Sequence, residues 1–156
     1  MNVLTIDVET THKDRQGGGT TALPYFNNRL VSVGWKWLLN RDVNYEFFYH
    51  KDKDTWYNSE TVNRIQNDLD KTDVLVGQNI KFDIMWLRAC GFKYDGVIYD
   101  TMVAEYLRSK GRRWSLALDA LAKRYNVTQK ETDLVTPYLK DGKTFFDIPA
   151  EIVEEY

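Results

Sequence analysis

An acidic pair at the end of the first apolar run constrains this chain more than any other feature. The run Val3–Ile6 predicts a β-strand, and Asp7-Val8-Glu9 follows it directly. Successive side chains of a strand point to opposite faces, so Asp7 and Glu9 share one face. Two neighbouring carboxylates repel unless a cation lies between them, and Mg²⁺ and Mn²⁺ prefer such oxygen ligands. The pattern predicts a metal site; the alternative is a solvated strand end before a turn at Thr10-Thr11.

A third carboxylate lies far along the chain, after another predicted strand. The apolar run Val74–Gly77 ends in glycine, and apolar residues at helical spacing follow it from Ile80. Asp83 therefore lies in about the first turn of a helix that starts beside a sheet edge, where it can face Asp7 and Glu9. The alternative is a carboxylate that only complements the positive end of the helix dipole.

The rest of the chain predicts alternating strands and helices. Strands are expected over Val3–Val8, Leu30–Leu38, Asn44–Tyr49, Val74–Gly77 and near Val97–Tyr99. Helices are expected over Ser59–Leu69, Ile80–Cys90, Thr101–Arg108, Ser115–Tyr125 and Ala150–Tyr156. The segment Thr10–Asn28, which contains Gly17-Gly18-Gly19, predicts a long loop.

The order of these elements indicates an α/β fold with a mixed sheet. The short turn Asn40-Arg41-Asp42 joins the second and third strands as an antiparallel hairpin. The helix Ser59–Leu69, after a serine cap, then crosses over to Val74–Gly77, and such strand-helix-strand connections are usually parallel. Helices are expected to cover both faces.

Two further patterns are open to a structural or a functional interpretation. Val31, Val33, Trp35 and Trp37 alternate along one strand, which predicts a sheet face packed under a helix rather than a base-stacking surface. A basic cluster occupies one connection between helices and consists of Arg108, Lys110, Arg112 and Arg113. This cluster is either a solvated turn or a local phosphate contact.

Composition limits the class of protein. With 156 residues, 43% hydrophobic and 28% charged, the chain is expected to form one globular domain over residues 1–156. The net charge of −2 gives no general attraction to nucleic acid, so any DNA contact needs local patches. The lone Cys90 cannot form an internal disulfide. Without a signal peptide or a long apolar span, a cytoplasmic monomer with no membrane contact is expected.

Four motifs in order resemble a known family. They are Asp7-x-Glu9, Asn79-x-Lys81-Phe82-Asp83, Tyr99-Asp100-Thr101-Met102 and Ser115-Leu116-x-Leu118-x-x-Leu121-Ala122. The set resembles the 3′–5′ exonuclease domain of family A DNA polymerases, the DNA polymerase I type, within the DEDD superfamily. Ile148-Pro149 followed by Val153 and Tyr156 resembles the start of the third motif, Tyr-x-x-x-Asp, and indicates the tyrosine branch. The similarity runs from Val3 to the last residue.

The resemblance implies a ribonuclease H-like fold and a site with two divalent ions, Mg²⁺ or Mn²⁺. Asp7 would contact both ions, Glu9 the first and Asp83 the second. Tyr156 would help to position the attacking water. Asn79 would help to hold the terminal nucleotide, and the Thr10 backbone would border its sugar.

The function implied is hydrolysis of DNA from its 3′ end with release of 5′-mononucleotides, as proofreading during DNA replication. The partners implied are a single-stranded DNA 3′ end and a polymerase domain in the parent protein. The family's fourth carboxylate would follow Tyr156, so the resemblance implies a domain that lacks its C-terminal segment and leaves its activity open. Two alternatives remain: a non-catalytic domain that guides DNA, and an RNA exonuclease resembling ribonuclease D.

Overall fold

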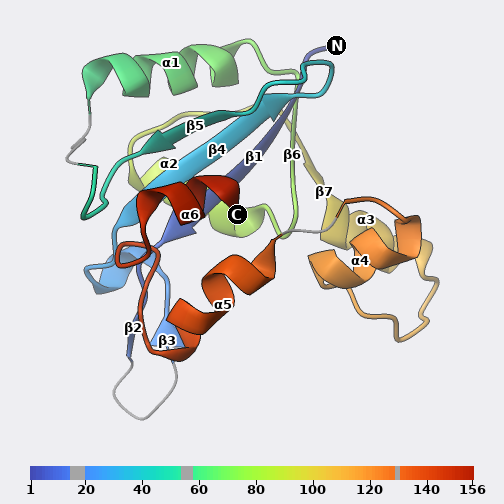
Figure 1. Ribbon diagram of the computed structural model, residues 1–156. Coiled ribbons are helices and arrows are strands. Elements are labelled where there is room, and N and C mark those ends of the chain that lie inside the picture. The colour runs from blue at the N-terminus through green and yellow to red at the C-terminus, as the bar shows by residue number, and fades with distance from the viewer. Residues whose placement is uncertain (15–19, 54–57, 129–130) are drawn as a thin grey trace.

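A five-stranded mixed sheet forms the centre of the computed structural model, which describes residues 1–14, 20–53, 58–128 and 131–156 (Figure 1). The strand order is β5-β4-β1-β6-β7. The bounds are β1 Val3–Thr10, β4 Leu30–Trp37, β5 Asn44–Phe47, β6 Val74–Gly77 and β7 Val97–Asp100. β4 pairs antiparallel with β1 and β5, whereas β6 pairs parallel with β1 and β7. The predicted mixed sheet is confirmed.

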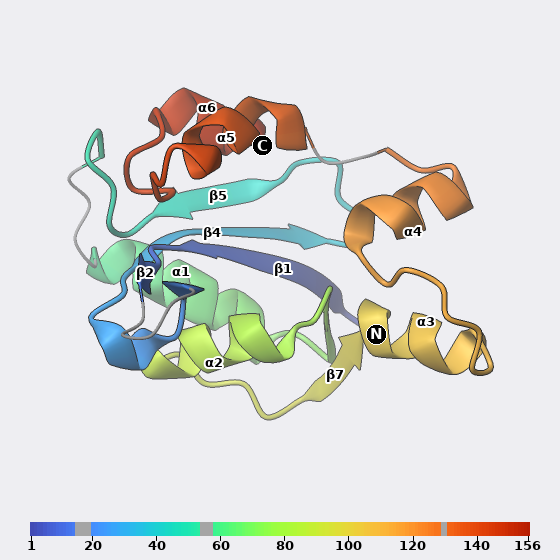
Figure 2. The same ribbon diagram turned by 90° about the horizontal axis from the view of Figure 1, so that it is seen from below.

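Helices cover both faces of this sheet (Figure 2). α1 (Ser59–Asp70) and α2 (Lys81–Ala89) lie on one face, and α5 (Thr132–Lys140) and α6 (Ala150–Glu155) lie on the other. Beside β7 lie α3 and α4, with bounds Thr101–Arg108 and Leu118–Tyr125. This arrangement confirms the predicted ribonuclease H-like α/β fold. Within the described ranges, no helix has the length and apolar character needed to cross a bilayer.

Two apolar cores hold the layers together. The larger one joins the sheet to α1 and α2 and includes Ile6, Trp35, Ile65 and Trp86. The smaller one joins the other face to α5 and α6; its buried members are Val31, Phe47, Val135, Ile148, Ala150 and Val153. Because the apolar side chains of β1 face the larger core, its alternate side chains face α6.

A β-bulge interrupts the pairing of β1 with β4 just beyond the acidic pair. Glu9 lies opposite Ser32, whereas Thr10 lies opposite Leu30, so Val31 is an extra residue in β4. An extra residue reverses the faces of the side chains before it. Val33 and Trp35 therefore lie in the larger core, while Val31 lies in the smaller one. The prediction that all four alternating apolar residues share one face is wrong at Val31 for this reason.

Two local predictions differ from the structure, and a third concerns residues that it does not describe. The cap of α1 is Asn58, whose side chain accepts a hydrogen bond from the Glu60 amide at 3.0 Å, rather than a serine. The expected long loop contains a two-stranded sheet, β2 (Lys13–Asp14) with β3 (Thr20–Thr21), and a 3₁₀ turn, η1 (Pro24–Phe26). The glycine tract at 17–19 lies outside the described residues.

The sequence did not predict α5, because Pro137 lies inside it. Proline lacks the amide that an interior helical position normally donates, and it usually ends a helical pattern. The Thr136 hydroxyl donates to the Thr132 carbonyl at 2.6 Å within this helix. Val135 is buried in the smaller core, so tertiary packing favours the helix over the local propensity.

Candidate active site

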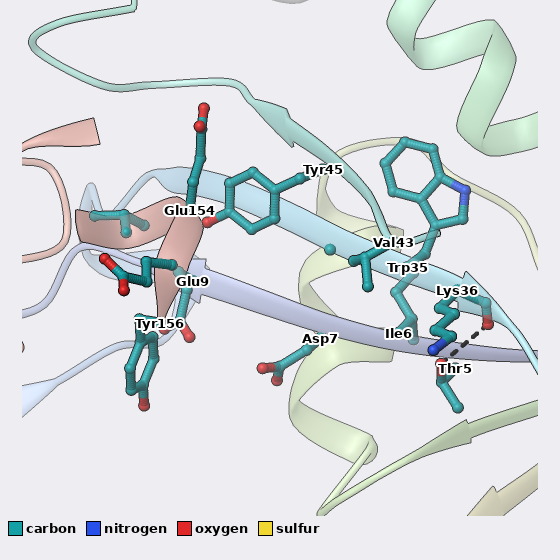
Figure 3. A pocket seen from close by; sticks show the side chains of 13 residues that line it. Thr5, Ile6, Asp7, Glu9, Trp35, Lys36, Val43, Tyr45, Glu154 and Tyr156 are labelled. Carbon is teal, nitrogen blue, oxygen red and sulfur yellow. Dashed lines mark hydrogen bonds between the residues drawn. The ribbon is translucent and has the colours of Figure 1, made fainter. Parts of the chain in front are cut away.

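β1 presents Asp7 and Glu9 on the face that lies under α6. The two residues lie opposite Gly34 and Ser32 of β4 and line a pocket of about 420 Å³ together with Tyr156 (Figure 3). The Asp7 side chain is exposed, whereas Glu9 and Tyr156 are half-buried. The structure therefore brings two of the predicted carboxylates and the predicted tyrosine to one pocket.

The floor and wall of this pocket include residues that the sequence reasoning did not assign. A Cβ atom at Gly34 would lie 3.3 Å from Cδ2 of Tyr45, so the glycine makes room for that ring over the pocket floor. Lys36 of β4 and Glu154 of α6 also line it. The alternation of side chains along β4 indicates these floor residues, because the face opposite Val33 and Trp35 must carry Gly34 and Lys36.

A turn distant in sequence holds α6 above β1. His50 follows β5, is buried, and hydrogen-bonds through Nε2 to the Ile148 carbonyl at 2.8 Å. The Ala150 amide donates to Oδ2 of Asp52 at 3.3 Å, at the start of α6. These contacts and the packing of Val153 in the smaller core bring Tyr156 over the acidic strand.

Asp83 reaches β1 from the edge of the strand rather than from its α6 face. Its side chain is 3% exposed, and Oδ1 accepts a hydrogen bond from the Val8 amide at 3.0 Å. β6 pairs with β1 only over Val3–Thr5. The carboxylate of α2 thus satisfies a β1 amide just past the end of this pairing, between Asp7 and Glu9 in sequence. This contact goes beyond the alternative in which Asp83 only complements its own helix.

The two predicted substrate-binding residues flank these carboxylates without lining the pocket. Asn79 lies in the turn between β6 and α2 with φ of 56°, a left-handed conformation that asparagine tolerates better than most residues. Its backbone amide donates to Oδ1 of Asp100 at 3.0 Å. Thr10 is the last residue of β1, is buried, and follows Glu9 at the bulge.

The donor chemistry of the three carboxylates suits a hard divalent cation. In the part of the chain that the structure describes, no three His, Cys, Asp or Glu side chains form a group that could hold a metal ion. Asp7 and Glu9 share a pocket, and Asp83 contacts the backbone between them. The residues therefore fit such an ion by type, and their side chains must approach one another to coordinate it.

A second pocket, of about 740 Å³, adjoins the first and shares Glu155 and Tyr156 with it. Its far wall is formed by α3 and α4. Glu105 belongs to that wall. It is 5% exposed and accepts hydrogen bonds from Arg124 at 2.6 Å and from the Tyr125 hydroxyl at 2.5 Å. The hydrogen bond from Tyr125 is the main cause that lowers the pKa of Glu105, and the same bond raises the pKa of Tyr125.

The predicted basic cluster is next to this carboxylate. The Arg108 side chain lies 3.4 Å from Oε2 of Glu105 and 4.9 Å from the centre of the Tyr125 ring. Arg112 lies 4.9 Å from the centre of the Trp114 ring, and Arg124 packs on the same ring at 4.7 Å. Of these arginines, Arg108 lines the second pocket, so one member of the predicted basic cluster borders the space that adjoins the acidic pocket.

The fold and the acidic pocket define a ribonuclease H-like α/β domain with a carboxylate-bearing central strand. A model of the 3′-5′ exonuclease of DNA polymerase A type matches residues 25–141, and the chain belongs to this family. The matched range contains Asn79 and Asp83, whereas Asp7, Glu9 and Tyr156 lie outside it. Their assignment rests on the motifs and on the geometry of the pocket. No curated protein matched the chain in a sequence search.

Proposed function

We propose that this 3′–5′ exonuclease domain hydrolyses single-stranded DNA from the 3′ end, releases 5′-mononucleotides and depends on two divalent ions, Mg²⁺ or Mn²⁺. Proofreading for an attached polymerase domain is the role we infer for it. The observation that carries the proposal is the meeting of three chain segments at β1. Asp7 and Glu9 line one pocket with Tyr156, and Asp83 contacts the strand at Val8.

Each residue has a role that its position supports. Asp7, which lines the pocket with Glu9, would contact both ions, while Glu9 would hold the first and Asp83 the second. Such ions supply charge neutralisation at the scissile phosphate and acidify a water. The Tyr156 hydroxyl would orient the attacking water.

The substrate strand would be held on both sides of these residues. Asn79 would contact the terminal nucleotide, and the Thr10 backbone would border its sugar. Arg108 of α3 lines the second pocket, which adjoins the first, so Arg108 and the nearby Arg112 would contact phosphates further along the strand. A local basic surface of this kind is required because the net charge of the chain is −2.

The test is hydrolysis of a 5′-labelled DNA strand and of RNA of the same sequence, with Mg²⁺, Mn²⁺ or chelator. We expect the labelled DNA to give a ladder of products shortened from the 3′ end, and only when a divalent metal ion is present. Asp7→Asn should lower the rate by about 10²–10³, the usual loss when one electrostatic stabiliser is removed. Asp95→Asn, at an exposed acidic position between α2 and β7, is the matched control and should match the wild type.

Two outcomes would replace this proposal. Faster hydrolysis of the RNA would indicate a ribonuclease D-like exonuclease. Binding of DNA with no hydrolysis under any metal condition would indicate a domain that only guides the strand. Equal rates for Asp7→Asn and Asp95→Asn would exclude Asp7 as the shared metal ligand.

A further inference from the structure

The turn that carries Asn79 is held by a residue from another element. α2 has no side-chain hydrogen bond at its N-cap, Ile80. The preceding Asn79 has φ of 56°, in the left-handed region, which costs free energy unless neighbouring contacts maintain it. The hydrogen bond from the Asn79 backbone amide to Oδ1 of Asp100, at 3.0 Å, is a contact of this kind.

The same oxygen of Asp100 caps the next helix. Oδ1 also accepts hydrogen bonds from the amides of Met102 at 2.9 Å and Val103 at 3.3 Å, at the start of α3. Capping of α3 by an aspartate is an ordinary structural role. The bond to Asn79 is a separate feature, because it joins the ends of two neighbouring parallel strands, β6 and β7.

A second contact fixes the same pair of turns. The Thr101 hydroxyl lies 3.2 Å from the Gly77 carbonyl and also hydrogen-bonds to Oε1 of Gln78. A Cβ atom at Gly77 would lie 3.2 Å from the Ile6 carbonyl oxygen, so this turn is closely packed against β1. The backbone of this turn has little room to adopt a different path. Its hydrogen bonds therefore determine the position of Asn79 and the start of α2.

We propose that Asp100 is a positioning residue of the exonuclease site. It holds Asn79 for the terminal nucleotide and sets the start of α2, which brings Asp83 to the Val8 amide. This inference rests on the proposed function for the roles of Asn79 and Asp83. It adds that a residue outside both pockets and without a reacting atom controls how tightly the strand is bound.

Three variants separate the two roles of Asp100. Asp100→Ser keeps a hydroxyl that can cap α3, but its shorter side chain loses the hydrogen bond with the Asn79 backbone amide. Asp100→Asn keeps an oxygen at the same place without the charge, so it controls for electrostatics. Asn58→Ala removes the cap of α1, which is remote from the site, and controls for the general cost of a lost cap.

The first readout is hydrogen exchange of the Asn79 backbone amide, measured by NMR in the full chain. The second is binding of a single-stranded DNA oligonucleotide with phosphorothioate linkages, which resist hydrolysis. In Asp100→Ser we expect exchange at Asn79 to be at least about tenfold faster and the Kd to rise about tenfold, as for loss of one charge-assisted hydrogen bond. Asp100→Asn should restore both values to within about threefold of the wild type, and Asn58→Ala should change neither.

Unchanged exchange at Asn79, or unchanged DNA binding, in Asp100→Ser would overturn the inference while the proposed function stands. A loss of binding in Asn58→Ala as large as in Asp100→Ser would also overturn it, because the effect would then reflect stability alone. A wild-type protein that binds the oligonucleotide but does not hydrolyse natural DNA would overturn the proposed function. The comparison of Kd values would still decide the role of Asp100.

Discussion

Asp83 has a structural contact in addition to its proposed metal-binding role. Its buried carboxylate accepts the Val8 amide, and a buried amide without a partner costs about 1–3 kcal/mol. The two roles can be separated, because an asparagine side chain still offers an oxygen to Val8 but is a poorer ligand for a hard cation.

We predict that Asp83→Asn unfolds with a free energy within about 1 kcal/mol of the wild type in chelator, whereas Asp83→Ala loses about 1–3 kcal/mol. Both variants should lose about 10²–10³ in the rate of DNA hydrolysis. Urea denaturation and single-strand turnover measure the two effects. Equal stability losses in Asn and Ala variants would show that the Val8 contact does not stabilise the fold.

At the scale of elements, α3 and α4 depend on one buried carboxylate. Glu105 of α3 accepts hydrogen bonds from Arg124 and Tyr125 of α4. Its pKa is lowered mainly by the Tyr125 hydrogen bond, so its contribution to stability is complete above the unfolded pKa and is lost as the pH falls through the folded pKa. The pKa of Tyr125 is raised by the same bond, so its contribution is lost as the pH rises through its folded pKa.

We therefore predict a stability difference between wild type and Glu105→Gln that depends on pH. The difference should be greatest between the two titrations, near neutral pH. It should shrink below the ordinary carboxyl value of 4.5 and again above the ordinary tyrosine value of 10.0. Thermal unfolding across this range measures it, with Glu60→Gln on the exposed face of α1 as control. A difference that is constant with pH would contradict the prediction.

At the scale of the whole molecule, the proposed metal site joins two elements, β1 and α2, that also meet through packing and through the hydrogen bond from the Val8 amide to Asp83. Asp7 and Glu9 belong to the central strand, and Asp83 belongs to a helix that begins beyond β6. An ion that binds all three would stabilise the folded chain by mass action, since the unfolded chain does not hold these residues together.

We predict that a divalent ion at ten times its Kd raises the free energy of unfolding by about 1.4 kcal/mol, or roughly 3–6 °C in Tm. Asp7→Asn should lose this shift and, in chelator, should be at least as stable as the wild type, because one of two neighbouring charges is gone. Differential scanning calorimetry with added Mg²⁺ or Mn²⁺, then chelator, is the measurement. A full Tm shift in Asp7→Asn would place the ion elsewhere.

The sequence determined the features that follow from local periodicity. Alternation in β1 put Asp7 and Glu9 on one face, and the change from a strand to a helical pattern put Asp83 in the first turn of α2. The parallel connection into β6 followed from the crossover rule. These features depend only on the spacing of apolar and polar residues along one segment, so residues close in sequence are enough to predict them.

Only the tertiary structure decided the features that join distant segments. The bulge at Val31, the helix α5 around Pro137 and the position of α6 each depend on packing across the smaller core. The hydrogen bond from Asn79 to Asp100 depends on the pairing of β6 with β7. Such contacts join residues that are far apart in the chain, and no local pattern in either segment specifies the other. The sequence by itself thus determined which carboxylates share a strand, and the packing of the two layers determined which residues hold them in place.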